Sequence, residues 1–408
     1  MTMYSKKITD EKISKSIVFF FLLQNVNASL KTVFEFSDEL SRLISLGTGF
    51  FILSFLVRSF NSVWKRKASL FVKIVFLFVL VYGVSIFQSK YIRGEDIGLL
   101  LSDSALWTFA FWIPIGIYTS AISDYTILYK TFKRYSLWIS LFLFISFVWF
   151  YLVGSKQEAK DYNMFFSYAL VLPLLIHINE YIDSKTKIYG IVALVEIVAI
   201  LLYGSRGAFL CLGGYFLLKM FLGSLNKSEK KYYIFTVILI SFSLLYLISS
   251  SSTLEMLGFN SRIISKMSEG EAMSGREYVW QAGTLLISER PLLGYGLGGE
   301  FYQMSWLCER ITGVLIEEYS SLTPHNGFLQ LMLNFGIPLG ASFGLYILFS
   351  IRKINVVSEK YIKDLIIILF AAYVLPALTV SDGIFIKPGI AVYLFIVGSL
   401  KNKKYEYR

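Results

Sequence analysis

Two arginines and one histidine are the side chains of this 408-residue sequence whose positions best suit chemistry on an anionic substrate: Arg206, Arg276 and His325. The planar guanidinium of an arginine can bond two phosphate oxygens at once. A histidine can accept a proton near neutral pH. Together these groups could bind a phosphate or pyrophosphate and activate a hydroxyl group.

Arg276 lies at the start of an expected loop helix. Ser274-Gly275-Arg276-Glu277 precedes an apolar run at helical spacing that ends at Pro291. This pattern predicts a capping box in which Ser274 caps the helix and Glu277 returns the bond. The first turn of a helix favours anions, so an arginine there suits a phosphate clamp. A solvated arginine paired with a glutamate is the alternative interpretation.

Arg206 and His325 each lie next to a long apolar segment. Arg206 is the charged residue of the tight turn Gly204-Ser205-Arg206-Gly207-Ala208, where it could bind a lipid phosphate or only anchor two helix ends by snorkelling. In Thr323-Pro324-His325, the threonine is the expected N-cap and the proline the first helical residue. His325 is therefore predicted in the first turn of a helix.

Composition identifies the environment in which these groups must act. The chain is 55% hydrophobic and 16% charged, whereas an average soluble domain is about a quarter charged. Its net charge of +11 therefore indicates a membrane protein rather than a nucleic-acid partner. Two histidines and two cysteines provide no zinc-type cluster and no disulfide framework.

Apolar runs of about 20 residues predict an all-α, polytopic membrane protein with twelve spans. Each run is bounded by polar or charged residues. The runs cover 14–32, 41–60, 69–89, 101–122, 137–153, 164–181, 188–204, 207–224, 233–251, 327–349, 364–381 and 387–400. With both termini in the cytoplasm, the inner segments hold 24 Lys and Arg residues and the short outer loops hold 7. This asymmetry predicts the topology.

The expected organisation has three parts. Residues 1–251 form nine spans, 252–326 a large external loop with short helices and part of the active site, and 327–408 three further spans.

Three ionisable residues inside the spans have other interpretations. His177 lies near the cytoplasmic end of its span and is interpreted as a helix-packing residue. Glu196 lies near the middle of a span, where an ionisable group suggests function by default. Lys219 could reach it, and a structural ion pair between them is favoured over a proton relay.

Four motifs resemble the O-antigen ligase and polymerase superfamily, which transfers glycans carried on undecaprenyl pyrophosphate. They are GSRGAFL (204–210), SGREYVW (274–280), PLLGYGLGGEF (291–301) and TPHNGFLQLMLNFGIPLG (323–340). Their order and spacing, within a twelve-span frame with one large outer loop, carry the resemblance. It covers roughly residues 160–345, whereas the first five spans match only in hydropathy.

The resemblance implies a metal-independent, inverting glycosyltransferase of the membrane-embedded C type, without a cofactor. Arg206 and Arg276 match the family's arginines and would hold the donor pyrophosphate. His325 matches its histidine and would orient or deprotonate the acceptor hydroxyl. Asn326, Tyr295 and the glycines of 294–299 would shape the pocket. Arg290 is a less favourable substitute for Arg276, because it lies at the negative end of the helix dipole.

The expected activity is polymerisation of lipid-linked repeats into surface polysaccharide, O-antigen or capsule, on the outer face of the bacterial inner membrane. The alternative is a ligase that transfers the glycan to lipid A-core or another acceptor, and a flippase is a remote alternative. The lean towards a polymerase rests on the stretch Asp161–Tyr168. Membrane lipids are expected partners, a chain-length regulator and a flippase could act with the enzyme, and no nucleic acid is expected.

Overall fold

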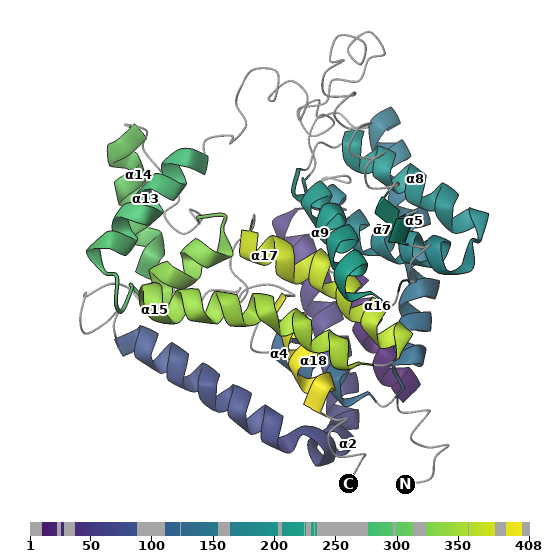
Figure 1. Cartoon of the computed structure of the whole chain (residues 1–408), viewed down its shortest axis with the longest axis horizontal. Helices are drawn as coiled ribbons and strands as arrows, with labels where there is room; N and C mark the ends of the chain where they lie inside the picture. Colours follow the sequence, from purple (N-terminus) through teal and green to yellow (C-terminus); the bar gives the residue numbers. More distant parts are fainter. Residues whose placement is uncertain are drawn as a thin grey trace. The chain divides into compact units, whose positions relative to one another are not determined.

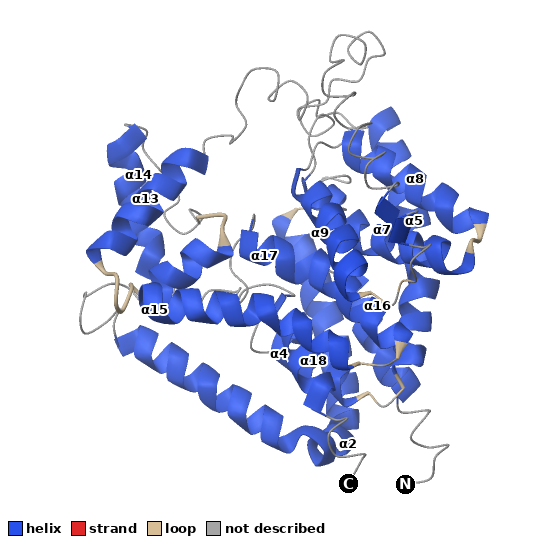
Figure 2. Ribbon diagram, viewed as in Figure 1, coloured by secondary structure: helices blue, strands red, loops and turns tan. Residues whose placement is uncertain are grey.

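All regular structure in the described residues is helical, and the computed structural model contains no strand among them (Figures 1 and 2). The described residues are 10–22, 26–27, 37–87, 111–122, 124–153, 164–202, 206–223, 225, 230–231, 233–234, 276–296, 299–312, 324–357, 359–379 and 389–401. The predicted all-α fold is confirmed for this part of the chain.

Several helix bounds follow the apolar runs of the sequence, whereas α5 begins twelve residues before its run and α2 covers two runs. The helices are α2 (Asp38–Phe87), α4 (Ile113–Ala121), α5 (Tyr125–Val153), α7 (Met164–Ser184), α8 (Lys187–Leu202), α9 (Arg206–Leu222), α13 (Arg276–Glu289), α14 (Gly299–Thr312), α15 (Gly327–Ser350), α16 (Lys360–Leu369), α17 (Leu375–Thr379) and α18 (Gly389–Lys401). A 3-10 turn, η5 (Ile351–Val356), follows α15, and a π-helical turn, η6 (Phe370–Val374), joins α16 to α17.

Twelve spans are not confirmed by the described residues. Two helical segments there are long and apolar enough to cross a membrane, Gly327–Asn355 and Lys360–Thr379. A third arises if the bent pair Leu46–Asn61 and Val63–Leu77 counts as one span. The expected span 233–251 lies almost wholly outside the described residues.

A bend within α2 takes the place of the short loop expected at 61–68. Two helical stretches meet across a kink here, and the backbone leaves the helical region at Lys67 (φ −134°). The polar residues that separate the two apolar runs therefore mark a kink between two helical stretches rather than a loop.

The chain forms two compact units, and each combines separate stretches of sequence. Unit 1 contains Met1–Ser59, Ile122–Ala272 and Ile354–Ala372, and unit 2 contains Phe60–Ala121, Met273–Lys353 and Tyr373–Arg408. The predicted division into nine spans, an outer loop and three further spans concerns membrane topology rather than compact units, and it stays a prediction.

Unit 1 is a bundle of apolar helices whose members share a buried polar network. Helix α7 packs against α5, α8 and α9, and α16 packs against α5, α7 and α9. Near one end, Lys219 of α9 forms an ion pair with Asp364 of α16, and both side chains are at most 1% exposed. Asn179 of α7 receives a hydrogen bond from Lys219 Nζ at 2.7 Å and one from the Tyr215 hydroxyl at 3.0 Å.

Two further ion pairs lie at the same helix ends. Lys133 of α5 pairs with Glu180 of α7, and Lys360 of α16 pairs with Asp183 of α7 at 2.9 Å. The charge count had assigned all these helix ends to the cytoplasmic side. The predicted topology requires these helix ends to lie close together, and they do so within unit 1. That they face the cytoplasm stays a prediction.

In unit 2, α4 and α18 pack with almost no space between their backbones. A Cβ added at Gly116 would lie 2.7 Å from the Ala391 carbonyl oxygen, and one added at Gly398 would lie 2.5 Å from Ser120 Cβ. Small residues allow this approach, as is usual between membrane helices. Arg66 donates to the Ala121 carbonyl and Lys67 to the Gly398 carbonyl, each at 2.8 Å, so cations cap both helix ends.

Candidate active site

Helix α15 begins later than the sequence predicted, and this moves His325 out of the helix. Asn326 is the N-cap: its side-chain oxygen accepts a hydrogen bond from Leu329 N–H at 3.1 Å, and the helix starts at Gly327. The expectation that Thr323 caps the helix and Pro324 opens it was therefore wrong. The first residue of the helix also packs tightly against α17. A Cβ at Gly327 would lie 2.2 Å from the Ala377 carbonyl oxygen, so this tight contact contributes to where the helix begins.

His325 directly precedes this cap and has an unusual backbone conformation. Its φ is +46°, in the left-handed region that few residues other than glycine adopt. Its side chain is partly exposed. Such a conformation costs free energy and persists when surrounding contacts impose it, and residues of this kind cluster at functional sites. The geometry thus singles out His325 for a functional hypothesis.

Helix α13 provides one of the contacts that hold the His325 segment. Trp280 Nε1 donates a hydrogen bond to the Pro324 carbonyl oxygen at 2.8 Å. Arg276, the first residue of α13, precedes Trp280 by four residues, which is about one helical turn. The structure therefore brings the start of α13 and the His325 segment together within unit 2. The Arg276 side chain and the predicted capping residue Ser274 lie outside what the structure describes.

The loop after α13 packs onto a break in α15. At Gly336 the backbone has φ 77° and ψ 169°, and two residues later comes Pro338, which has no N–H to donate to the Asn334 carbonyl. That carbonyl accepts instead from Gly296 N–H at 2.9 Å, and the Leu333 carbonyl accepts from Tyr295 N–H at 2.7 Å. In return, Ile337 N–H donates to the Pro291 carbonyl at 2.7 Å.

This exchange of backbone hydrogen bonds depends on glycine at the closest approaches. A Cβ at Gly336 would lie 2.2 Å from the Leu292 carbonyl oxygen, and one at Gly294 would lie 2.4 Å from the Leu333 carbonyl oxygen. Both glycines have positive φ, at 77° and 63°. Of the glycines expected to shape a pocket, Gly294 therefore has a defined task, which is to dock the loop on α15.

Tyr295 and Arg290 have protein partners in the structure. The Tyr295 side chain is 2% exposed within the core of α13, α14 and α15, and its hydroxyl bonds Glu289 at 3.0 Å. The Arg290 guanidinium lies over the Tyr295 ring, 4.9 Å from its centroid. These contacts give both residues structural roles. Their expected substrate binding, like that of Asn326, stays a prediction.

Arg206 is the first residue of α9 and belongs to unit 1, whereas Arg276 and His325 belong to unit 2. Arg206, which was predicted in the middle of a tight turn, is therefore already part of the helix. Its side chain lies outside what the structure describes. Each of the three residues predicted to act on the substrate consequently lies at, or one residue before, the start or N-cap of a helix, where backbone N–H groups favour an anion.

The expected ion pair between Glu196 and Lys219 was wrong. Glu196 of α8 instead accepts a hydrogen bond from the Ser140 hydroxyl of α5 and contacts His177 Nδ1 of α7 at 3.0 Å. Lys219 pairs with Asp364, a residue that the sequence did not single out. His177 is fully buried and stacks on Tyr189 at 5.9 Å, as expected of a packing residue.

The cysteines and acidic residues in the described ranges form no cluster of metal ligands. No group of three or more His, Cys, Asp or Glu side chains there could hold a metal ion. Burial raises the pKa of the Cys308 thiol, which is 3% exposed, so this cysteine is predominantly protonated near neutral pH.

Trp280 and Gly336 are site-forming residues that reasoning from the sequence missed. Trp280 was noted as part of an apolar helix face and of the block 274–280, and neither pattern indicates its hydrogen bond to Pro324. Gly336 had a usable signal, since a glycine two residues before a proline inside a long apolar run is typical of a broken helix.

Comparison with known families supports the resemblance that the four sequence motifs carry. Residues 191–344 match the family model described as O-antigen ligase, which places this region in the O-antigen ligase and polymerase superfamily. The matched region contains Arg206, α13 and its docked loop, and the start of α15 with His325. Comparison with curated proteins finds no match. The family match and the apolar helices together support an integral membrane protein, and the match is to a family of glycosyltransferase-like enzymes that act on lipid-linked glycans.

Proposed function

We propose that the protein is a membrane glycosyltransferase that polymerises undecaprenyl-pyrophosphate-linked oligosaccharide repeats into surface polysaccharide, O-antigen or capsule. The residues whose arrangement supports the proposal lie within the region that matches the family model. There, a histidine with a left-handed backbone precedes α15, and the helix that begins at Arg276 is hydrogen-bonded to its segment through Trp280.

In the proposed reaction, a hydroxyl of the acceptor glycan attacks the anomeric carbon of the donor sugar from the side opposite the pyrophosphate. The new glycosidic bond forms as the bond to the pyrophosphate oxygen breaks, so the configuration inverts. His325 accepts the hydroxyl proton. Arg206 and Arg276 bind the pyrophosphate and stabilise the negative charge that it gains as it leaves. The reaction needs neither a metal ion nor a cofactor.

A ligase is the second candidate, since the matching family model is described as O-antigen ligase and the superfamily includes both activities. A ligase would use the same pyrophosphate clamp and the same base but would transfer the glycan to lipid A-core or another acceptor. The stretch Asp161–Tyr168 that suggested a polymerase begins outside the described residues, at 161–163, and then enters α7.

The proposal places the protein in the bacterial inner membrane with both termini in the cytoplasm and the active site on the outer face. The polar helix ends that meet within each unit support this topology. Its substrates would be the lipid-linked donor and a glycan acceptor, and a chain-length regulator and a flippase would act with it.

A deletion strain tests the activity and separates the two candidates. Loss of the polymer ladder on a glycan gel, with one repeat still attached, indicates a polymerase. Loss of all attached repeats while polymer stays on the carrier lipid indicates a ligase. An unchanged ladder would overturn both.

Complementation with variants then tests the arginine clamp. Arg276→Ala should fail to restore the glycan, because the developing charge loses a partner worth about 100-fold in rate. Arg310→Ala is the matched control: Arg310 stacks on Trp306 of α14 at 4.7 Å and has no place in the proposed clamp. Full complementation by Arg276→Ala at equal membrane abundance would remove this arginine from the mechanism.

A further inference from the structure

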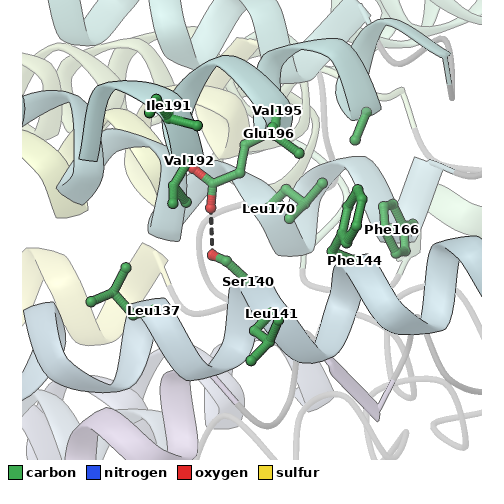
Figure 3. Close-up of a pocket in the computed structure, with 11 residues that line it drawn as sticks. Leu137, Ser140, Leu141, Phe144, Phe166, Leu170, Ile191, Val192, Val195 and Glu196 are labelled. Atoms are coloured by element: carbon green, nitrogen blue, oxygen red, sulfur yellow. Dashed lines mark hydrogen bonds between the residues drawn. The ribbon is translucent and has the colours of Figure 1, made fainter. Parts of the chain in front are cut away.

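Unit 1 contains a pocket that the proposed chemistry leaves unused. It has a volume of about 230 Å³ and lies between α5, α7 and α8 (Figure 3). Its walls are apolar side chains, Leu137, Leu141, Phe144, Phe166, Leu170, Ile191, Val192, Val195 and Ala199, and its polar groups are Ser140 and Glu196. Cavities of about 150 Å³ with such walls already bind small hydrocarbons.

The two polar groups of the pocket are engaged with protein partners. The Ser140 hydroxyl donates to Glu196 across one wall (Figure 3), and the Glu196 carboxylate also contacts His177 Nδ1 at 3.0 Å. A sugar in this pocket would leave its hydroxyl groups without partners, which is costly. The pocket therefore suits a hydrocarbon chain.

The mouth of the pocket opens on the apolar outer surface of the bundle. Four of its lining residues are also among the exposed apolar side chains of α5 and α8: Leu141 (50%), Phe144 (43%), Ile191 (58%) and Val195 (40%). In an integral membrane protein this surface faces lipid. A chain could therefore enter from the side, within the bilayer.

The pocket extends along α8 towards the end that leads to Arg206. From Ile191 to Ala199 the helix rises about 12 Å, and α8 ends three residues later at Leu202. The helix rise and the maximum reach of the chain place the Arg206 Cα within about 20 Å of the Ala199 Cα. A lipid whose phosphate is bound by Arg206 could thus lay its chain in the pocket.

We infer that this pocket binds the isoprenoid chain of the lipid-linked glycan donor. The inference rests on the proposed function, because that function supplies the lipid and the phosphate at Arg206. The size of the pocket favours a single-chain lipid: 230 Å³ is below the range of about 300–1,000 Å³ for whole drug-sized ligands, so it holds a segment of one chain. A diacyl lipid would leave its second chain outside.

Photolabelling of the full-length protein in lipid nanodiscs tests this inference. One probe is a polyprenyl phosphate with a diazirine on its chain, and the other is phosphatidylglycerol with a diazirine on an acyl chain. Mass spectrometry should locate the polyprenyl label on the pocket segments of α5, α7 and α8. Excess unlabelled polyprenyl phosphate should compete, and excess phosphatidylglycerol should not.

Two variants fill the pocket in different ways. Ala199→Phe occupies its interior, and Leu141→Trp narrows its mouth at an exposed site where the fold should tolerate a larger side chain. Each should reduce polyprenyl labelling about fivefold, a modest factor because lipid tails are as apolar as the pocket and binding depends on packing. Val198→Phe, on the neighbouring exposed position of α8 (45%), should leave labelling unchanged.

The inference is overturned if the polyprenyl label lies elsewhere, if phosphatidylglycerol labels the pocket equally well, or if both filling variants label like the wild type. Labelling does not require turnover, so the two proposals can fail separately. Glycan transfer without labelling of the pocket would reject this site alone. Pocket labelling in a protein that transfers no glycan would reject the proposed function alone.

Discussion

The two histidines of the chain lie in contrasting regions. His177 belongs to the buried network of unit 1, where its side chain is fully buried, Nδ1 contacts Glu196, and Nε2 is buried without a hydrogen-bond partner among the described residues. His325 is partly exposed and precedes α15, in a strained conformation, beside a segment bonded to Trp280. Burial makes His177 a packing group that no substrate reaches, whereas His325 is accessible and backed by a rigid helix start.

The same contrast extends to the charged residues of the two regions. Lys219, Asp364 and Glu196 are almost fully buried and satisfy one another or nearby polar groups. A buried ion pair is weak evidence for net stability, but removing one partner leaves an uncompensated charge. The network therefore predicts large effects on folding, whereas substitution of His325 itself is expected to affect the reaction.

The largest effect on stability is expected for Lys219→Met. This change leaves Asp364 buried without its cation, which should cost about 3–5 kcal/mol. Thermal unfolding of the purified protein in detergent measures the loss. Lys360→Met is the matched control, because Lys360 pairs with Asp183 at a site where its side chain is 47% exposed, and it should cost at most about 1 kcal/mol. Equal unfolding temperatures for the two variants would contradict the structural role of the network.

A smaller loss of stability is expected for Gly336→Ala in the His325 region. The backbone there (φ 77°, ψ 169°) is essentially restricted to glycine, and the new Cβ would lie 2.2 Å from the Leu292 carbonyl oxygen. We expect about 2–3 kcal/mol from strain of this kind. Gly283→Ala in α13 meets only ordinary contacts at 3.7 Å and should be neutral or slightly stabilising. An unaffected Gly336→Ala protein would show that the docked loop does not fix the break in α15.

The smallest effect is expected for Trp280→Phe, which removes the hydrogen bond to the Pro324 carbonyl. Such a bond is worth about 0.5–1.5 kcal/mol, so kcat should fall about tenfold at most while the unfolding temperature changes little. A residue whose substitution lowers kcat without lowering the unfolding temperature acts by positioning a catalytic group rather than by stabilising the fold. Trp306→Phe, at an exposed site on α14, is the control and should leave kcat unchanged. A Trp280→Phe protein with wild-type kcat would show that this contact does not hold His325 in place.

The helices were predictable from the sequence because long apolar runs are bounded by polar residues. Predicted and observed bounds agree within three residues for α7 and α8, and α9 begins within one residue of its expected position. These runs are set by the thickness of the membrane and by local polarity, so they need no knowledge of packing.

Side-chain partners were much harder to predict, since they depend on how the helices rotate and pack. The sequence suggested Glu196 as the partner of Lys219, and only the packing of α9 against α16 selects Asp364 instead. The start of α15 was ambiguous for a similar reason. Thr323 and Asn326 are both good N-caps, and the contacts of Trp280 and Gly327 are invisible in the local sequence.

The most direct test of the proposed base compares the two histidines in the purified protein. The measurement is the initial rate of glycan transfer from a lipid-pyrophosphate donor, normalised to the amount of folded, monodisperse protein. We predict that His325→Ala loses at least about 100-fold in rate, and that His177→Gln stays within about threefold of the wild type. A His325→Ala protein that transfers glycan at the wild-type rate would contradict the assignment of His325 as the base.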